Sequence, residues 1–275
     1  MKIALYYRHI DPADAPALEQ LIEELRRCGV AVTTVHDGDS VADFDYLFSV
    51  GGDGTLLASV QLLSPSTPQH SPALPPVVGI NFGHLGFLTT VGKENIGLLV
   101  QELLDGHFTV EERTLLQIQN SESPIQNSKF ALNEVFVHRL EEASLLRTQV
   151  FVDGDFVATY AGDGVIVATP TGSTAYSLSC GGPILTPTSR CFAITPISAH
   201  TLTLRPIIIP DTSTIRLHIC DDCFLGIDSH RATLSGNHDL TIRRAPFTIR
   251  LIRISSQNFF SAIRDKLMWG TEVRP

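Results

Sequence analysis

An apolar run that breaks into glycines and resumes as a second apolar run constrains the fold of this chain most strongly. Residues 46–63 read YLFSVGGDGTLLASVQLL, so a strand-like run ends at a Gly-Gly-Asp-Gly-Thr cluster and helical spacing follows. Glycines between a strand and a helix usually bring main-chain amides close to a phosphate group. The sequence therefore predicts an α/β unit with an anion-binding turn, and the carboxylate of Asp53 inside that turn needs a chemical reason.

Strand-like and helical runs alternate through the N-terminal part of the chain. Residues 14–28 place their leucines and isoleucine on one helical face, with Asp14 as the candidate N-cap, Pro16 in the first turn and Gly29 at the end. This alternation predicts a parallel, doubly wound, Rossmann-like sheet. The predicted strands are 2–7, 31–35, 46–50 and 77–80, the predicted helices are 14–28, the segment from the glycine turn to about 63, and 94–104, and 64–76 is predicted to be a loop.

Short β-branched runs separated by turn residues extend from about residue 108 to residue 254. This pattern predicts a β-rich second domain that is sandwich-like or layered. Residues 258–269 return to helical spacing and are expected to pack on the first domain. The sequence thus predicts an α/β + β protein, with an α/β domain of residues 1–107 and 258–275 and a β-sandwich-like domain of residues 108–257.

Composition excludes several classes of protein. With 43% hydrophobic and 18% charged residues, a chain of 275 residues can bury a sizeable core. Its formal net charge of -9 argues against binding to duplex nucleic acid, which needs a cationic face. No apolar run approaches the roughly 20 residues that span a bilayer, and the N-terminus lacks a signal-peptide pattern. Together with five scattered cysteines, these features predict a cytoplasmic protein that does not associate with membranes.

Asp53 has two possible chemical tasks. It could bind the divalent cation that accompanies a nucleoside triphosphate, or it could accept the proton of an attacking hydroxyl group. A carboxylate is a weak base, so the second task requires placement close to a hydroxyl that its surroundings have acidified. Gly52 and Gly54 would let a ligand reach the main chain, and Thr55 could cap the following helix. The alternative is a tight turn that has no ligand.

Hydroxyl side chains crowd the stretch TPTGSTAYSLSCGGP at residues 169–183. They could form the polar floor of a pocket for a sugar, amide or phosphate, or they could belong to a solvent-exposed loop. The adjacent polar residues Asn133 and Glu134 interrupt an apolar strand, so they either face solvent or line a cleft. Asp163 precedes a glycine, and this pair is by itself a hairpin-turn signal.

Three weaker candidates complete the set. His200 and Arg205 could contact phosphate, although an ordinary structural role is favoured for a lone histidine. Cys220 and Cys223 have the spacing of half a zinc site, but no second pair accompanies them. An interpretation of these thiols as small apolar side chains is therefore favoured.

Taken together, these stretches resemble the NAD kinase family, whose members phosphorylate the 2′-hydroxyl of the adenosine ribose of NAD. The Gly-Gly-Asp-Gly-Thr cluster alone also occurs, in identical or similar form, in phosphofructokinases and in diacylglycerol and sphingosine kinases, whereas TPTGSTAY is more specific. The resemblance covers nearly the whole chain in order. Its motifs are GGDGT at 51–55, GHLGF at 83–87, Asn133-Glu134, Asp163-Gly164, TPTGSTAY at 169–176, HTLTLRP at 200–206 and KLMWG at 266–270.

The resemblance implies an active site between an α/β domain and a β domain, with NAD and ATP as substrates. It also implies a divalent cation, usually Mg²⁺, and a homodimer or homotetramer. Asp53 matches the proposed general base. Gly52, Gly54 and Thr55 match the phosphate loop, and Phe87, Asn133, Glu134, Asp163, Thr174, Ala175, Tyr176 and Ser179 match the dinucleotide pocket. The chain departs from the family at Asp228-Ser229-His230, where Asp-Gly-Gln or Asp-Ser-Gln is usual.

Two other functions stay open at this point. A lipid or sugar kinase of the same superfamily would share the Asp53 turn but should lack the hydroxyl-rich loop. A nucleotide-sensing protein would bind NAD or NADP without turnover. Within the kinase reading, NAD or NADH could be the acceptor and ATP or polyphosphate the donor.

Overall fold

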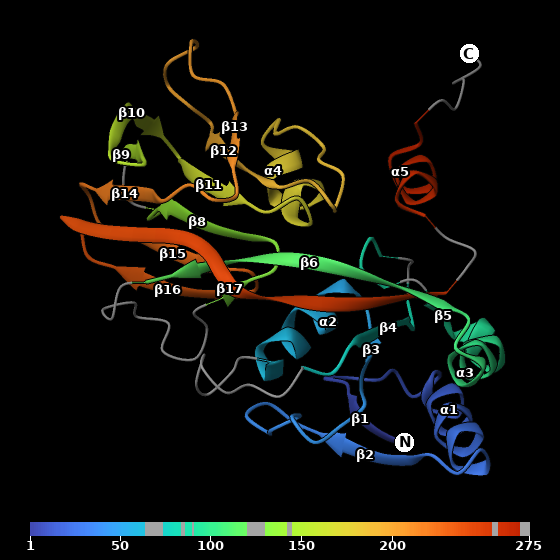
Figure 1. The fold of residues 1–275 in the computed structure, drawn as a ribbon. Coiled ribbons are helices and arrows are strands. Elements are labelled where there is room, and N and C mark those ends of the chain that lie inside the picture. The colour runs from blue at the N-terminus through green and yellow to red at the C-terminus, as the bar shows by residue number, and fades with distance from the viewer. Residues whose placement is uncertain are drawn as a thin grey trace. The chain divides into compact units, whose positions relative to one another are not determined.

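The computed structural model describes residues 1–63, 74–83, 86–89, 91–119, 130–141, 145–254 and 258–269. Two compact units make up the chain, one formed by Met1–Glu112 with Ile249–Pro275 and the other by Arg113–Thr248. Strands β6 (Phe108–Ile118) and β17 (His238–Ile254) contribute residues to both units (Figure 1). Most of the loop predicted for residues 64–76 lies outside the described residues.

The first unit contains a parallel sheet and the helices that the sequence predicts. Its strands run in the order β4-β3-β1-β2, all parallel, and β5 and the end of β17 also pair with β4. Leucines of α1 and α3 pack into one core with Ile3, Leu5 and Phe48. The elements are β1 (Lys2–Tyr6), α1 (Ala15–Arg27), β2 (Ala31–Val35), β3 (Tyr46–Gly51), α2 (Asp53–Val60), η1 (Gln61–Leu63), β4 (Val77–Asn81), β5 (Val91–Gly92), η2 (Lys93–Asn95), α3 (Ile96–Asp105) and α5 (Phe259–Leu267). This arrangement confirms the predicted α/β fold.

Helix α1 shows how local sequence sets the boundaries of an element. Its C-terminus closes as a Schellman motif, because Gly29 adopts φ +75° and the N–H of Val30 donates to the carbonyl of Leu25 at 3.1 Å. Asp14 occupies the N-cap position, but its side chain makes no capping hydrogen bond. Its carboxylate instead pairs with Lys93 of η2 at 2.5 Å, so the residue expected to cap α1 links this helix to η2.

The second unit consists of antiparallel strands in two sheets. One sheet has the order β10-β9-β14-β17, with β6 and β7 added to it, and the other has the order β13-β12-β11-β8-β15-β16. Buried aliphatic side chains from strands of both sheets form a single core, which confirms the sandwich-like prediction. The remaining elements are β7 (Phe130–Ala131), β8 (Glu134–Arg139), β9 (Leu146–Val152), β10 (Asp155–Gly162), β11 (Gly164–Ala168), η3 (Gly172–Thr174), α4 (Tyr176–Ser179), β12 (Cys191–Ile197), β13 (Ile207–Pro210), β14 (Ile215–Ile219), β15 (Cys223–Ile227) and β16 (His230–Leu234).

The C-terminal helix α5 begins at a capping box. The Asn258 side chain accepts from the N–H of Ser261 at 2.9 Å, and the Ser261 side chain accepts from the N–H of Asn258 at 3.1 Å. Among the described helices, none has the length and apolar character needed to cross a bilayer.

Candidate active site

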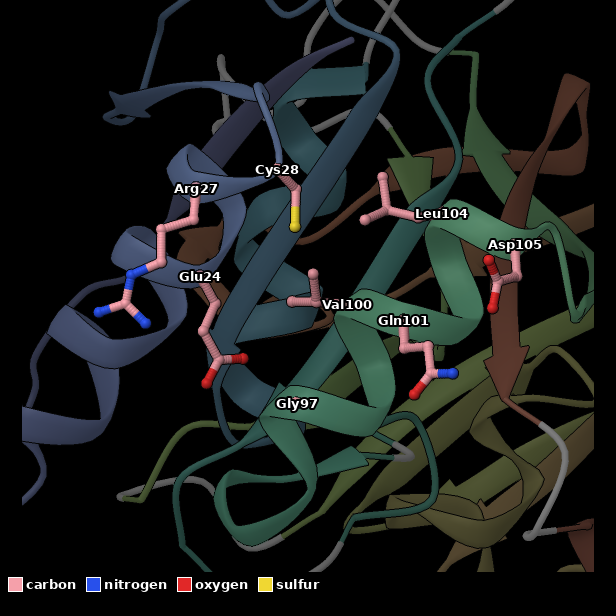
Figure 2. Close-up of a pocket in the computed structure, with 8 residues that line it drawn as sticks. All are labelled: Glu24, Arg27, Cys28, Gly97, Val100, Gln101, Leu104 and Asp105. Carbon is pink, nitrogen blue, oxygen red and sulfur yellow. The ribbon is translucent and has the colours of Figure 1, made fainter.

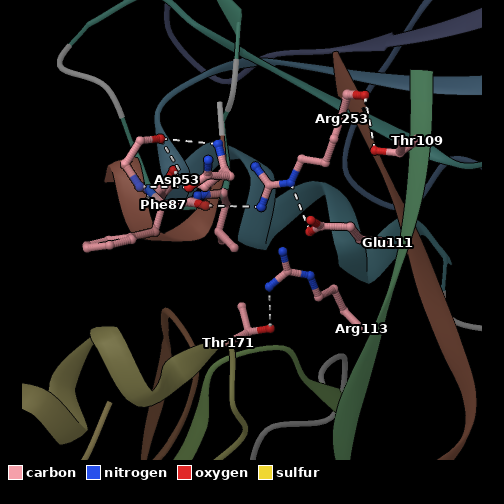
Figure 3. A network of polar contacts seen from close by, with 10 residues as sticks. Asp53, Phe87, Thr109, Glu111, Arg113, Thr171 and Arg253 are labelled. Carbon is pink, nitrogen blue, oxygen red and sulfur yellow. Dashed lines mark hydrogen bonds and ion pairs between the residues drawn. The ribbon is translucent and has the colours of Figure 1, made fainter. Parts of the chain in front are cut away.

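Asp53, the first residue of α2, connects the two glycine-containing turns of the first unit. Its Oδ2 accepts a hydrogen bond from the N–H of Phe87 at 2.7 Å. Its Oδ1 accepts three bonds, each 3.1 Å long, from the N–H groups of Leu88 and Thr89 and from the Thr89 hydroxyl (Figure 3). A carboxylate oxygen has two lone pairs, and among the described residues only the Phe87 N–H donates to Oδ2, which leaves capacity for one more donor or for a cation.

Two glycines near Asp53 are required by the packing of the chain itself. Gly51 adopts φ +146°, and a Cβ added there would overlap the side chain of Thr55. A Cβ added at Gly86 would overlap the Asp53 carboxylate. Thr55 lies inside α2, three residues after the N-cap Gly52, so the expectation that its side chain caps the helix is wrong.

Gly52 and Gly54 behave differently. A Cβ added at either position would meet no atom of the described chain within 4 Å, and neither residue has a positive φ. Packing and backbone strain therefore do not demand glycine at these positions. Both residues lie at the N-terminus of α2, where main-chain N–H groups lack helical partners.

Asn133 and Glu134 lie buried at the start of β8 in the second unit, with 8% and 6% exposure. Their burial excludes the alternative in which this polar pair faces solvent. Asn133 Oδ1 and Glu134 Oε2 are both buried and have no hydrogen-bond partner among the described atoms. Buried polar atoms in folded proteins nearly always have partners, so these two oxygens are available to an ordered water or to a ligand.

Asp228 holds the main chain beneath that pair. Its buried carboxylate accepts hydrogen bonds from the N–H groups of Leu132 and Asn133 at 2.8 Å and of Glu134 at 3.1 Å. Burial raises the pKa of Asp228 to about 6. Burial and the neighbouring Asp228 charge raise the pKa of Glu134 to about 8. Glu134 is therefore the member of this pair that keeps its proton to the higher pH.

The hydroxyl-rich loop is mostly turned inward. The Thr169 hydroxyl donates to the carbonyl of Leu132 at 2.5 Å, and the Ser173 hydroxyl donates to that of Pro170 at 2.7 Å. The Ser177 hydroxyl is engaged with another hydroxyl inside the unit. These three side chains are buried, so the solvent-loop alternative is wrong. The same contacts show that these hydroxyls fix the loop and do not form a pocket floor.

Tyr176 and Glu134 lie together. The main-chain N–H of Tyr176 donates to the Glu134 carboxyl group, and the Tyr176 ring packs edge-on against Phe136 with centroids 5.5 Å apart. Burial raises the pKa of the Tyr176 phenol, and the nearby groups of Cys180, Asp163 and Glu134 raise it further.

The other predicted residues of this loop occupy three different environments. The Thr174 hydroxyl donates to the carbonyl of Thr171 at 3.3 Å, Ala175 is half-buried and Ser179 is exposed. A cavity of about 510 Å³ begins directly after Ser179. It is lined by Cys180, Gly181, Pro196, Ser198, Ala199, Thr201, Leu202, Leu204, Arg205 and Pro206.

Asp163 lies where the chain passes from one sheet to the other. Strands β10 and β11 on either side of it belong to different sheets, so the hairpin expected from Asp163-Gly164 is wrong. The hairpin turn stands at Asp153-Gly154, where both residues have positive φ. The Asp163 carboxylate accepts from Arg139 Nε at 2.6 Å, and this bond lowers the pKa of Asp163.

The weaker candidates have ordinary surroundings. His200 and Arg205 are exposed, and the Arg205 guanidinium donates to the carbonyls of Leu202 and Leu204. Cys223 is fully buried, and burial raises its pKa to about 12, which suits the apolar role. Within the described ranges, no group of three or more His, Cys, Asp or Glu side chains could hold a metal ion.

Sequence reasoning assigned no role to three polar residues that support these positions. Thr89 contacts Asp53, and Asp228 contacts residues 132–134, in both cases from far along the chain. Arg113 is buried, and its guanidinium group donates to the Thr171 hydroxyl at 3.3 Å (Figure 3). The local sequence gave no signal for Arg113, because the charged residues Glu111 and Glu112 precede it directly.

A further cavity of about 320 Å³ lies between α1 and α3 (Figure 2). None of the residues predicted from the sequence to form a site lines it. It is lined by Glu24, Arg27, Cys28, Gly97, Val100, Gln101, Leu104 and Asp105.

The chain combines an α/β unit, which has a glycine turn at a helix N-terminus, with an antiparallel β unit. This combination is typical of a two-part nucleotide-binding protein. A family model described as the ATP-NAD kinase N-terminal domain matches residues 15–108, and one described as the ATP-NAD kinase C-terminal domain matches residues 132–254. The chain belongs to the ATP-NAD kinase family.

Individual relatives agree with this assignment. A protein of Flavobacterium psychrophilum named NAD kinase is 40% identical over 236 residues, 84% of this chain and 78% of that protein. One of Cytophaga hutchinsonii with the same name is 35% identical over 98% of this chain and 92% of its own.

Solved structures agree as well. Yeast NADH kinase complexed with NADH superposes with a TM-score of 0.87 at 26% identity, over 99% of this chain and 89% of that one. The NAD kinase of Archaeoglobus fulgidus in complex with ATP gives 0.80 at 27% identity, over 98% and 99%.

Proposed function

We propose that this protein transfers the γ-phosphoryl group of ATP to the 2′-hydroxyl of the adenosine ribose of NAD, forming NADP and ADP. Membership of the ATP-NAD kinase family supports this activity. The observation that carries it furthest is the Asp53 carboxylate, which stands beside two glycines that packing does not require and whose Oδ2 accepts a single hydrogen bond among the described residues.

The glycine turn is the proposed phosphate site. The N–H groups of Asp53 and Gly54 lie in the first turn of α2, where N–H groups and the helix dipole favour an anion. Gly52 and Gly54 leave room for phosphate oxygens against the main chain. Thr55 belongs to the same turn, although its side chain packs on Gly51.

Asp53 is the proposed general base, acting through Oδ2. The 2′-oxygen forms a bond to the γ-phosphorus, its proton passes to Oδ2, and the bond to the bridging oxygen breaks, so that ADP leaves with the electron pair. Three donors on Oδ1 hold the carboxylate in place, and this positioning lets a weak base act. The spare lone pair of Oδ2 equally fits a divalent cation, which would neutralise phosphate charge when it binds with ATP.

The second unit is the proposed NAD pocket. The Asn133 Oδ1 can accept from a ribose hydroxyl, and the protonated Glu134 can both donate and accept. Tyr176 supports Glu134 from its main chain. The other proposed pocket residues are Phe87, Asp163, Thr174, Ala175 and Ser179.

Two broader properties belong to the same proposal. The protein is proposed to form a homodimer or homotetramer, which sedimentation velocity would resolve. It is proposed to work in the cytoplasm, and its five free cysteines suit a reducing compartment.

The test is a coupled assay. Purified protein is mixed with ATP, Mg²⁺ and NAD, and NADP formation is followed with an NADP-specific dehydrogenase. We expect an absorbance change that requires all three components. Parallel reactions with diacylglycerol and fructose 6-phosphate should give no phosphorylated product. Binding of NAD by calorimetry without NADP formation would instead identify a nucleotide sensor.

A further inference from the structure

A largely buried arginine contacts the turn that binds Asp53. Arg253 lies at the end of β17 within the first unit, and its side chain is 12% exposed. Its Nε donates to Glu111 Oε2 at 3.0 Å, and a terminal nitrogen donates to the carbonyl oxygen of Phe87 at 3.4 Å (Figure 3). Because Glu111 fixes one edge of the planar guanidinium, the other edge points at Phe87 in a defined direction.

The Phe87 carbonyl belongs to the peptide group whose N–H donates to Asp53. That N–H is the one of Leu88, and it donates to Oδ1 at 3.1 Å. Because a peptide group is planar, fixing its carbonyl also fixes the direction of its N–H. A charged donor on the carbonyl further polarises the N–H that Asp53 accepts. Arg253 and Asp53 therefore contact opposite ends of one rigid group.

A second cation steadies the same turn. Lys266 of α5 lies over the ring of Phe87, with its nitrogen 4.8 Å from the ring centroid. The main chain of Phe87 is thus held by Arg253, and its side chain is held by Lys266. Neither contact uses an atom of Asp53, so neither occupies Oδ2.

We infer that Arg253 is a positioning residue, held by Glu111, which fixes the Asp53 carboxylate for phosphoryl transfer through the Phe87–Leu88 peptide group. This inference rests on the proposed role of Asp53. It separates two contributions to the rate: Asp53 supplies the basic oxygen, and the Glu111–Arg253 pair sets its position.

The experiment compares Arg253→Met with Arg250→Met. Arg250 lies on the same strand and donates to the carbonyl of Leu74, away from the Asp53 turn, so it is a matched guanidinium-to-carbonyl control. We expect Arg253→Met to slow single-turnover phosphoryl transfer by about tenfold to a hundredfold, with KM for NAD and ATP within about threefold of wild type. Arg250→Met should keep the wild-type single-turnover rate. Equal rates in the two variants would overturn the inference.

Two further variants keep the test decisive. Arg253→Lys keeps the charge but cannot make both planar contacts, so a folded protein should show a rate between those of wild type and Arg253→Met. Wild-type rate in this variant would overturn the inference even if Arg253→Met does not fold. In an Asp53→Asn background, adding Arg253→Met should slow the single-turnover rate by less than threefold, because the effect of Arg253 passes through Asp53.

The two proposals fail separately. If Asp53→Asn keeps the wild-type rate, the role of Asp53 is wrong and the inference falls with it. If Asp53→Asn is slow but Arg253→Met matches its control, only the role of Arg253 is wrong.

Discussion

The Asp53 carboxylate occupies the place where a side chain at position 86 would stand. A Cβ added at Gly86 would overlap the carboxylate, while the N–H groups of the next three residues donate to it. The glycine turn before α2 and the turn at residues 86–89 therefore pack together because the Asp53 side chain fills the space that a side chain at position 86 would need. Any residue larger than glycine at position 86 must displace Asp53 or the turn.

Gly86→Ala should consequently damage both stability and rate. We expect the free energy of unfolding to fall by about 1–3 kcal/mol, as for overpacking of a dense site. Phosphoryl transfer should slow because the carboxylate moves. Urea denaturation and the coupled NADP assay measure the two effects. An alanine variant with wild-type stability and rate would show that the turn accommodates the methyl group without moving Asp53.

Gly54→Ala should have the opposite profile. No described atom lies within 4 Å of the added Cβ, and alanine is the better helix former by about 1 kcal/mol. Stability should therefore stay equal or rise. The affinity for ATP should fall, because the methyl group fills the space proposed for phosphate oxygens. Calorimetric titration with ATP checks this, and unchanged affinity would place the phosphate elsewhere.

Glu134→Gln should change how stability depends on pH. The folded-state pKa of about 8 lies above the ordinary carboxyl value, so the native state binds this proton more tightly than the unfolded state. The stabilisation is complete below the ordinary pKa and is lost as the pH rises through about 8. Glutamine does not titrate, so the stability of the variant relative to wild type should rise between pH 5 and pH 9 by up to a few kcal/mol.

Denaturation curves at both pH values measure that difference. A stability difference that stays constant across this range would show that Glu134 is ionised in the native protein at neutral pH. The same variant should raise KM for NAD, since glutamine replaces a carboxyl group in the proposed pocket.

Periodic patterns predicted the architecture well. Helix α1 and the strands of the parallel sheet follow from spacing, Pro16 and Gly29, because these signals act over a few neighbouring residues. The roles of Asp14 and Thr55 were less predictable. A capping residue type says only that a cap is possible, and here a lysine of η2 takes the Asp14 carboxylate while α2 begins ahead of Thr55.

Local sequence patterns could not predict the contacts within the site. Asp53 bonds to residues more than thirty positions away, and Asp228 bonds to residues more than ninety positions away. Composition suggested hydroxyls around a ligand, but whether Ser173 turns inward depends on which carbonyls the fold brings near. Arg253 looked like an ordinary strand residue, because nothing in LIRI indicates a contact with Phe87.

The most direct test of the account is the single-turnover rate of phosphoryl transfer in Asp53→Asn, at saturating ATP, Mg²⁺ and NAD. Thr89→Val is the control, because it removes one hydrogen bond to Oδ1 and keeps the carboxylate. We expect Asp53→Asn to bind NAD like wild type but to transfer phosphate more slowly by a factor of about 10² to 10⁴, while Thr89→Val stays within about tenfold of the wild-type rate. Equal losses in the two variants, or a wild-type rate in Asp53→Asn, would contradict the role of Asp53 as the base.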